Sequence, residues 1–63
     1  MLDTIWQEVV SRNIPHDNHE SDLYIPVTEE TTKLIYHYGL YYKVFTHTTH
    51  GNKWYDVAFA YDP

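Results

Sequence analysis

The sequence predicts one α+β domain over residues 1–63, in which two short helices precede a C-terminal antiparallel β-hairpin. The first third of the chain has apolar residues at helical spacing, and so does the middle third, between a threonine and a glycine. The last third is instead dense in β-branched and aromatic residues on both sides of a Gly-Asn pair. That pattern is typical of two strands joined by a tight turn.

The first helix is expected over about residues 3–12. Its apolar residues recur at intervals of three and four, which places them on one stripe that faces the core. Asp3 or Thr4 could cap its start. Asn13 to Pro15 should end it, because the residue before a proline avoids the α region. The stripe consists of Leu2, Ile5, Trp6, Val9 and Val10.

Residues 13–26 are predicted to form a polar connector, and Leu-Tyr-Ile at 23–25 is the candidate for a short third strand. Five of the nine acidic residues fall within or just after this connector. Charge runs of this kind are usually solvated loops or helix starts. The alternative is an acidic surface that a basic partner recognises. The five are Asp17, Glu20, Asp22, Glu29 and Glu30.

The second helix is expected to begin after Thr28, whose side chain can accept a hydrogen bond from the first turn. Glu29 and Glu30 then place negative charge at the positive end of the helix dipole. Gly39 is expected to end the helix, because glycine readily takes the left-handed conformation at that position. The core-facing residues, at helical spacing, are Val27, Thr31, Leu34, Ile35 and Tyr38.

The hairpin is expected to join residues 41–49 to residues 53–61 through a two-residue turn at Gly51 and Asn52. This turn fixes the register and pairs Tyr42 with Tyr61. The face with Tyr42, Val44 and Val57 is the more apolar and should pack on the helices, which leaves the other face exposed. A slip of one residue would exchange the two faces of one strand. The exposed face carries Lys43, Phe45, His47, Trp54 and Asp56.

The length and composition limit what the domain can be. A chain of 63 residues buries only about 60% of the surface of its unfolded state, near the lower limit for independent folding. It has no cysteine, so disulfides and thiolate metal sites are excluded, which is consistent with a reducing cytoplasm. Three sources of stability remain: packing of its two Trp, seven Tyr and two Phe residues, a metal bound by histidines, or oligomerisation. We favour aromatic packing and oligomerisation. Residues 1–8 do not resemble a secretory signal, and no apolar run approaches the ~20 residues of a membrane span.

The formal net charge of −5 argues against direct binding to nucleic acid. Phosphate binding requires a cluster or stripe of basic side chains, and the basic residues here are scattered along the chain. They are Arg12, Lys33, Lys43 and Lys53.

Two H-x-x-H pairs, His16/His19 and His47/His50, are the pattern closest to a metal site. Four imidazoles could complete a tetrahedral zinc site. Neither pair lies on a predicted helix in the metalloprotease pattern, so we interpret them as surface histidines and expect no metal and no cofactor. The expected pairing of His47 with Asp56 could orient a general base. It lacks a nucleophile and an oxyanion hole, so no enzymatic activity is expected.

The expected function is that of a small acidic, non-catalytic protein-binding module, an adaptor or inhibitor whose partner has a basic surface. A specific version is a mimic of nucleic acid, and the compact chain is typical of phage and mobile-element genomes. One alternative is a zinc protein built on the histidine pairs. Another is a structural subunit whose hairpin edge extends a sheet, in an assembly or a homodimer. The expected partner-binding residues are Asp17, Glu20, Asp22, Glu29, Glu30, Tyr36, Tyr41, Phe45 and Trp54.

Overall fold

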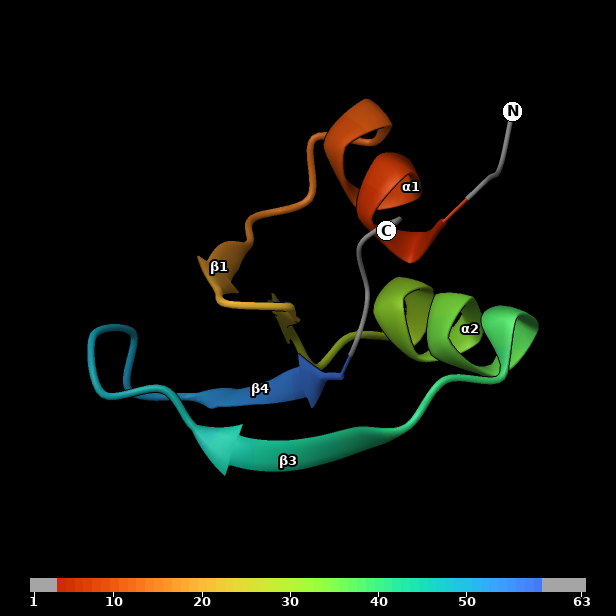
Figure 1. The fold of residues 1–63 in the computed structure, drawn as a ribbon. Coiled ribbons are helices and arrows are strands. Elements are labelled where there is room, and N and C mark those ends of the chain that lie inside the picture. The colour runs from red at the N-terminus through yellow and green to blue at the C-terminus, as the bar shows by residue number, and fades with distance from the viewer. Residues whose placement is uncertain (1–3, 59–63) are drawn as a thin grey trace.

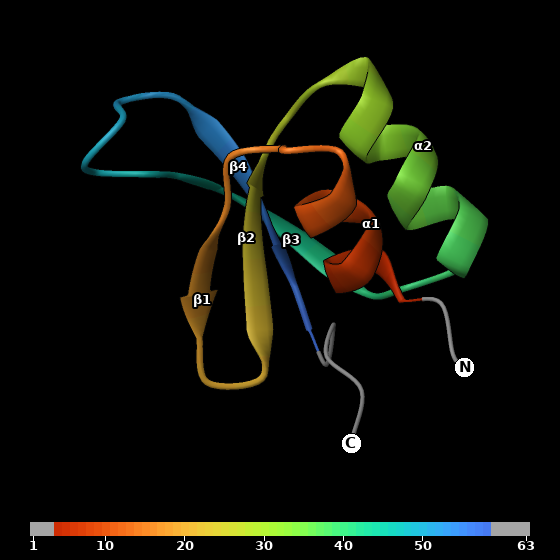
Figure 2. The same cartoon turned by 90° about the horizontal axis from the view of Figure 1, so that it is seen from above.

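The computed structural model describes residues 4–58. Its elements follow the order helix, strand, strand, helix, strand, strand, and the strands form one antiparallel sheet in the order β1-β2-β4-β3. Both helices lie on the same side of this sheet (Figure 1, Figure 2). The elements are α1 (Ile5–Ser11), β1 (Asp17–His19), β2 (Asp22–Pro26), α2 (Glu29–Tyr38), β3 (Tyr42–Thr46) and β4 (Lys53–Val57).

The predicted order of two helices followed by a hairpin is wrong, because the segment between the helices is itself a hairpin. Asp17 of β1 pairs with Tyr24 of β2. On its other side β2 pairs with β4, where Leu23 lies opposite Val57. The extended segment expected at 23–25 therefore lies inside the sheet. β1 escaped prediction because its three residues are polar and exposed, so it has no alternating apolar pattern.

Capping residues set the starts and ends of the helices. Thr4 caps α1 and accepts a hydrogen bond from the Gln7 N–H at 3.3 Å. Thr28 caps α2 in a capping box, in which the Thr28 and Thr31 side chains each accept a hydrogen bond from the other's backbone N–H. Gly39 ends α2 in the left-handed conformation, with φ +63°. Neither of these helices has the length and apolar character that crossing a membrane requires.

The hydrophobic core lies between the helices and the sheet. Trp6 and Tyr38 are partly buried and pack against it. Val10 and Val27, expected on the core-facing stripes, are instead 45% and 41% exposed. Val10 lies next to the last residue of α1, and Val27 precedes the N-cap of α2 and so lies outside that helix. The buried core consists of Ile5, Val9, Ile14, Leu23, Ile25, Leu34, Ile35, Tyr55 and Val57.

The C-terminal hairpin has a different register from the predicted one. Tyr42 pairs with Val57 instead of Tyr61, which lies outside the described residues, so the register shifts by four positions. The cause is that a six-residue loop over residues 47–52 replaces the two-residue turn. A hydrogen bond of 2.9 Å from the His47 N–H to the Asn52 carbonyl closes this loop. Because the shift is even, the side chains of β3 and β4 stay on their predicted faces.

Candidate functional site

The described part of the sheet has one face that neither helix covers, which we call the open face (Figure 1). Leu23, Ile25, Tyr55 and Val57 point into the core, so the residues between them along β2 and β4 point to the opposite side. The strand pairing aligns residues of β1 and β3 with these positions. The open face therefore carries Asp17, His19, Asp22, Tyr24, Lys43, Phe45, Trp54 and Asp56.

Aromatic and imidazole rings form a continuous row at one end of the open face. The ring centroids of Tyr24 and Phe45 are 4.8 Å apart, and those of Phe45 and His47 are 5.7 Å apart. Trp54 lies 4.7 Å from His47 and stacks on His50, also at 4.7 Å. Trp54 was expected to be exposed on this face, yet it is only 3% exposed because the two imidazoles pack against it.

His47 interacts with a residue of the other hairpin. Its Nε2 is 2.6 Å from a carboxylate oxygen of Asp17 in β1. The expected pairing of His47 with Asp56 is wrong, because the shifted register places Lys43 opposite Asp56 and puts His47 beyond the end of β3.

Two carboxylates approach each other at the opposite end of the open face. Burial raises the pKa of Asp56, and the hydrogen bond to Asp22 and the negative charge of Asp22 raise it further, while Lys43 lowers it. Oδ1 of Asp56 is buried and has no hydrogen-bond partner among the described residues. A pocket of about 260 Å³ opens here, lined by Asp22, Tyr41, Tyr42, Lys43, Asp56 and Ala58.

The two edges of the sheet differ in their chemistry. β1 is a short edge strand of three exposed residues, Asp-Asn-His, and short, charged edges discourage pairing with other chains. β3, the other edge, is a five-residue strand of sequence Tyr-Lys-Val-Phe-Thr. It contains no proline, and its residues have high β-propensity apart from the lysine.

The hydrogen bonds of β3 leave its outer side available. Ala58 N–H bonds to the Tyr41 carbonyl at 3.2 Å, and His47 N–H bonds to the Asn52 carbonyl at 2.9 Å, both in the register of the β3–β4 ladder. Hydrogen-bonded pairs alternate in an antiparallel ladder, so the odd-numbered residues of β3 bond to β4. The N–H and C=O groups that point outward are those of Tyr42, Val44 and Thr46.

Large apolar side chains are exposed beside this edge. Tyr41 is 86% exposed, Tyr36 on α2 is 69% exposed, Val44 is 53% exposed and Tyr42 is 41% exposed. A hydrogen bond to Tyr36 raises the pKa of the Tyr42 hydroxyl, so the two tyrosines are in contact. We call Tyr36, Tyr41, Tyr42 and Val44 the edge patch.

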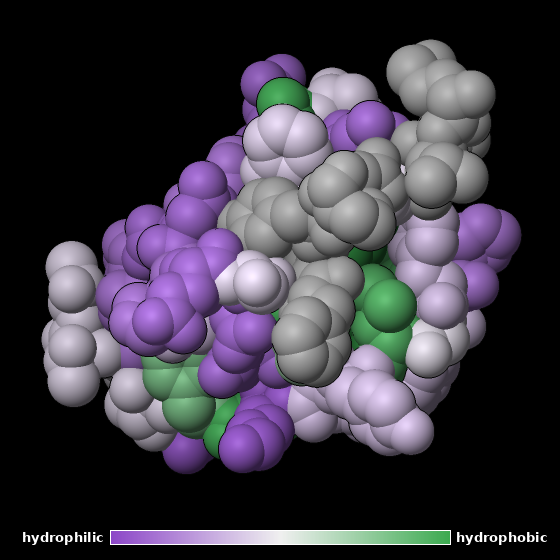
Figure 3. All heavy atoms as spheres, in the orientation of Figure 1, coloured by the Kyte–Doolittle hydropathy of each residue, from purple (hydrophilic) through white to green (hydrophobic). Residues whose placement is uncertain are grey.

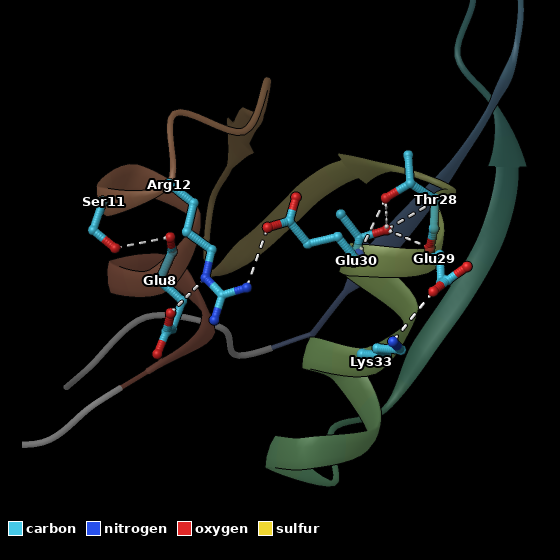
Figure 4. A network of polar contacts seen from close by, with 8 residues as sticks. Glu8, Ser11, Arg12, Thr28, Glu29, Glu30 and Lys33 are labelled. Carbon is cyan, nitrogen blue, oxygen red and sulfur yellow. Dashed lines mark hydrogen bonds and ion pairs between the residues drawn. The ribbon is translucent and has the colours of Figure 1, made fainter.

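Basic side chains neutralise part of the acidic stretch on the helix side (Figure 4). Arg12 binds Glu8 at 2.9 Å and Glu30 at 3.1 Å, which links α1 to α2. Lys33 binds Glu29 at 3.2 Å, one helical turn away. These ion pairs are exposed to solvent and therefore contribute little to stability, but they offset part of the negative charge on this side.

The rest of the acidic stretch belongs to the β1–β2 hairpin. Asp17 and Asp22 lie on the open face, and Glu20 is exposed in the turn between the strands. Hydrophilic residues dominate the visible surface around β1 (Figure 3). The five acidic residues singled out in the sequence therefore divide between two sides of the molecule and do not form one surface.

The structure brings some of the predicted partner-binding residues together and separates others. Tyr36 and Tyr41 fall in the edge patch, while Phe45 and Trp54 lie on the open face with Asp17 and Asp22. Sequence reasoning did not assign Tyr42 and Val44 to a binding surface, because both were expected under the helices. Their position on an edge strand, where α2 leaves both side chains exposed, follows only from the strand order.

Comparison with protein-family models, with curated proteins and with solved structures gives no match to this chain.

Proposed function

We propose that this chain is a non-catalytic protein-binding module that binds an extended, basic segment of a partner protein along the outer edge of β3. The observation that carries the proposal is the contrast between the edges of the sheet. β1 is short, polar and exposed, whereas β3 is longer, rich in β-branched and aromatic residues, and flanked by the edge patch. Natural proteins usually protect such an edge, and strand addition is a common mode of peptide recognition where they do not.

The backbone of β3 supplies the affinity in this proposal. Tyr42, Val44 and Thr46 direct N–H and C=O groups outward, so an added strand can continue the ladder. Every second side chain of that strand would lie on the helix side of the sheet, over Tyr42 and Val44 of the edge patch. An exposed apolar patch on a monomer this small usually marks an interface, and tyrosines contribute strongly to binding energy.

Charge supports a basic partner over a second copy of this chain. Each copy carries a formal charge of −5, so two copies repel each other at long range. The pocket beside the start of β3 is lined by Asp22 and Asp56, together with Lys43. A lysine or arginine of the partner would bring opposite charge to the two carboxylates.

Selection of a displayed library of random twelve-residue peptides on the immobilised protein tests this proposal. Peptides rich in Lys and Arg, with apolar residues at alternate positions, should be enriched. Val44→Pro should abolish their binding, because proline removes an outward N–H without breaking the β3–β4 ladder. Val44→Thr, which keeps that N–H, should weaken binding several-fold.

Val10→Thr is the matched control, because Val10 is similarly exposed but lies on α1. It should bind the selected peptides as the wild-type chain does. Failure to enrich any peptide, or equal binding by the Val44→Pro variant, would refute strand addition at β3. Enrichment of acidic peptides, or a dimer at micromolar concentration, would overturn the proposed partner class.

A further inference from the structure

We propose that Asp17, His47 and His50 form a binding site for a divalent ion of the zinc class. One potential ligand atom of each residue lies within 4.8 Å of those of the other two. The rings of His47 and His50 are 4.6 Å apart, and Nε2 of His47 is 2.6 Å from the Asp17 carboxylate. Zinc uses two imidazoles and one carboxylate in sites that keep a fourth position for water or another donor.

This grouping differs from the four histidines that the sequence brings to mind. Nδ1 of His16 lies 2.8 Å from the carbonyl oxygen of Ile14. His19 stacks on Tyr24 at 5.9 Å. Of the two H-x-x-H pairs, only His47 and His50 lie in the cluster, and the third ligand is a carboxylate from the other hairpin.

The loop over residues 47–52 fixes the relative position of the two histidines. Gly51 N–H bonds to the His47 carbonyl at 2.7 Å, and His47 N–H bonds to the Asn52 carbonyl at 2.9 Å. Gly51 has φ +73°, a left-handed conformation that glycine adopts without strain. This closed turn brings His47 and His50 side by side, so little conformational entropy remains to be lost when an ion binds.

Trp54 forms an apolar floor beneath the cluster. Its ring lies 4.7 Å from both imidazoles and is only 3% exposed. Its Nε1–H donates to the Asn52 side chain at 2.8 Å, which holds the indole in place. An apolar layer around a metal site restricts water and lowers the local dielectric, which strengthens the attraction between the ion and its ligands.

The hydrogen bonds of His47 specify what an ion would replace. The Thr49 N–H donates to Nδ1 at 3.3 Å, so Nδ1 is the acceptor and Nε2 carries the proton that is donated to Asp17. A zinc ion bound to Nε2 and to the carboxylate takes the place of this shared proton, which moves to Nδ1, so Nδ1 gives up the hydrogen bond that it accepts from the Thr49 N–H. Ligand atoms of a tetrahedral zinc site are about 3.4 Å apart, so Nε2 and the carboxylate oxygen separate slightly on binding.

Ion binding at this site would join the two hairpins. Asp17 belongs to the edge strand β1, whereas His47 and His50 belong to the β3–β4 loop, about 30 residues later. The three ligands are not held close together in the unfolded chain, so the ion binds mainly to the folded state and stabilises it. The site lies beyond the end of β3 and uses none of the outward backbone groups proposed for partner binding.

Zinc chloride titrated into the full chain, followed by calorimetry and thermal melting, tests the proposal. The wild-type chain should bind one zinc ion. Zinc at 100-fold above Kd should raise Tm by about 10 °C or more in a domain of this size. Cobalt(II) at the same site should give the visible absorption bands of tetrahedral coordination.

His50→Asn should abolish zinc binding and lower the metal-free Tm only slightly, because His50 is exposed although its ring stacks on Trp54. Asp17→Asn should weaken binding at least ten-fold. His37→Asn, on exposed α2 surface, and the double variant His16→Asn/His19→Asn are the controls and should bind as the wild type does. Absence of one-to-one binding by the wild-type chain, or undiminished binding by His50→Asn, would overturn the site.

Discussion

The carboxylate of Asp17 lies 2.6 Å from Nε2 of His47, so a single side-chain contact joins the edge strand β1 to the loop that follows β3. β1 otherwise pairs only with β2 among the described strands. The β2–β4 ladder already joins the two hairpins, and this contact adds a second link between them on the open face. It makes the position of the β3–β4 loop depend on the first hairpin.

Asp17→Asn should lower the free energy of unfolding by about 1 kcal/mol, because it weakens one charge-assisted hydrogen bond at a partly exposed site. Chemical denaturation in the absence of metal measures this change. Glu20→Gln, in the turn of the same hairpin, is the control and should change stability by less than about 0.5 kcal/mol. Equal effects of the two substitutions would mean that the Asp17–His47 contact does not stabilise the fold.

Val57→Ala and Val44→Ala remove the same atoms from two strands on the same side of the sheet, but Val57 is fully buried and Val44 is 53% exposed. Val57→Ala should cost about 2 kcal/mol or more, because it leaves a cavity in the core. Val44→Ala should cost less than about 0.5 kcal/mol. Urea denaturation distinguishes the two. Similar losses of stability in the two variants would mean that both valines lie in the core and that Val44 does not belong to an exposed edge patch.

Thr31→Val tests a buried polar cluster under the start of α2. The Thr31 hydroxyl donates a hydrogen bond to the Pro26 carbonyl at 2.6 Å and accepts one from the Thr28 backbone N–H at 3.0 Å. Valine fills nearly the same volume but cannot bond to the Pro26 carbonyl or the Thr28 N–H, which are partly buried, so the substitution should cost about 1 kcal/mol or more. The loss is read from the midpoint of denaturation. Thr48→Val, in the exposed loop, should be nearly neutral, and a neutral result for Thr31→Val would contradict the capping box.

Asp56→Asn should stabilise the protein at neutral pH. The pKa of Asp56 is raised above its ordinary value of 3.8 in the folded state, mainly by burial and then by Asp22. The ionised carboxylate therefore destabilises the folded state, and the penalty grows as pH rises from 3.8 through the folded pKa. The variant should melt above the wild type at pH 7, and the difference should shrink near pH 3.

Asp22→Asn should act in the same direction, because it removes the like charge that faces Asp56. The double variant should gain less than the sum of the single variants, since either change relieves the same repulsion. Additive gains, or a lower Tm for Asp56→Asn at pH 7, would show that the two carboxylates do not oppose each other.

The parts of the fold that depend on local signals follow from the sequence. Thr28 caps α2 and Gly39 ends it, as predicted, because capping depends on the chemistry of a few adjacent residues. The faces of the C-terminal hairpin are also as predicted despite the wrong register. An even shift conserves the alternation of side chains, so Phe45 still lies on the face away from the helices.

The features that could not be predicted from the sequence depend on contacts between residues that are far apart in the chain. Nothing local distinguishes Asp-Asn-His in β1 from a polar loop, since its strand conformation depends on pairing with β2. The contact of Asp17 with His47 joins the two hairpins, and neither the loop length nor the strand order that creates it is encoded locally. The same strand order decides that β3, rather than β2, is an edge.

Amide hydrogen exchange, resolved residue by residue and measured with and without a selected basic peptide, tests the role of β3 most directly. In the free chain, the outward amides of Tyr42, Val44 and Thr46 should exchange much faster than those of Lys43 and Phe45, which bond to β4. With the peptide bound, protection should rise at Tyr42, Val44 and Thr46. Binding by strand addition would be contradicted if protection rose on β1 or the helices while the exchange rates of the outward β3 amides stayed unchanged.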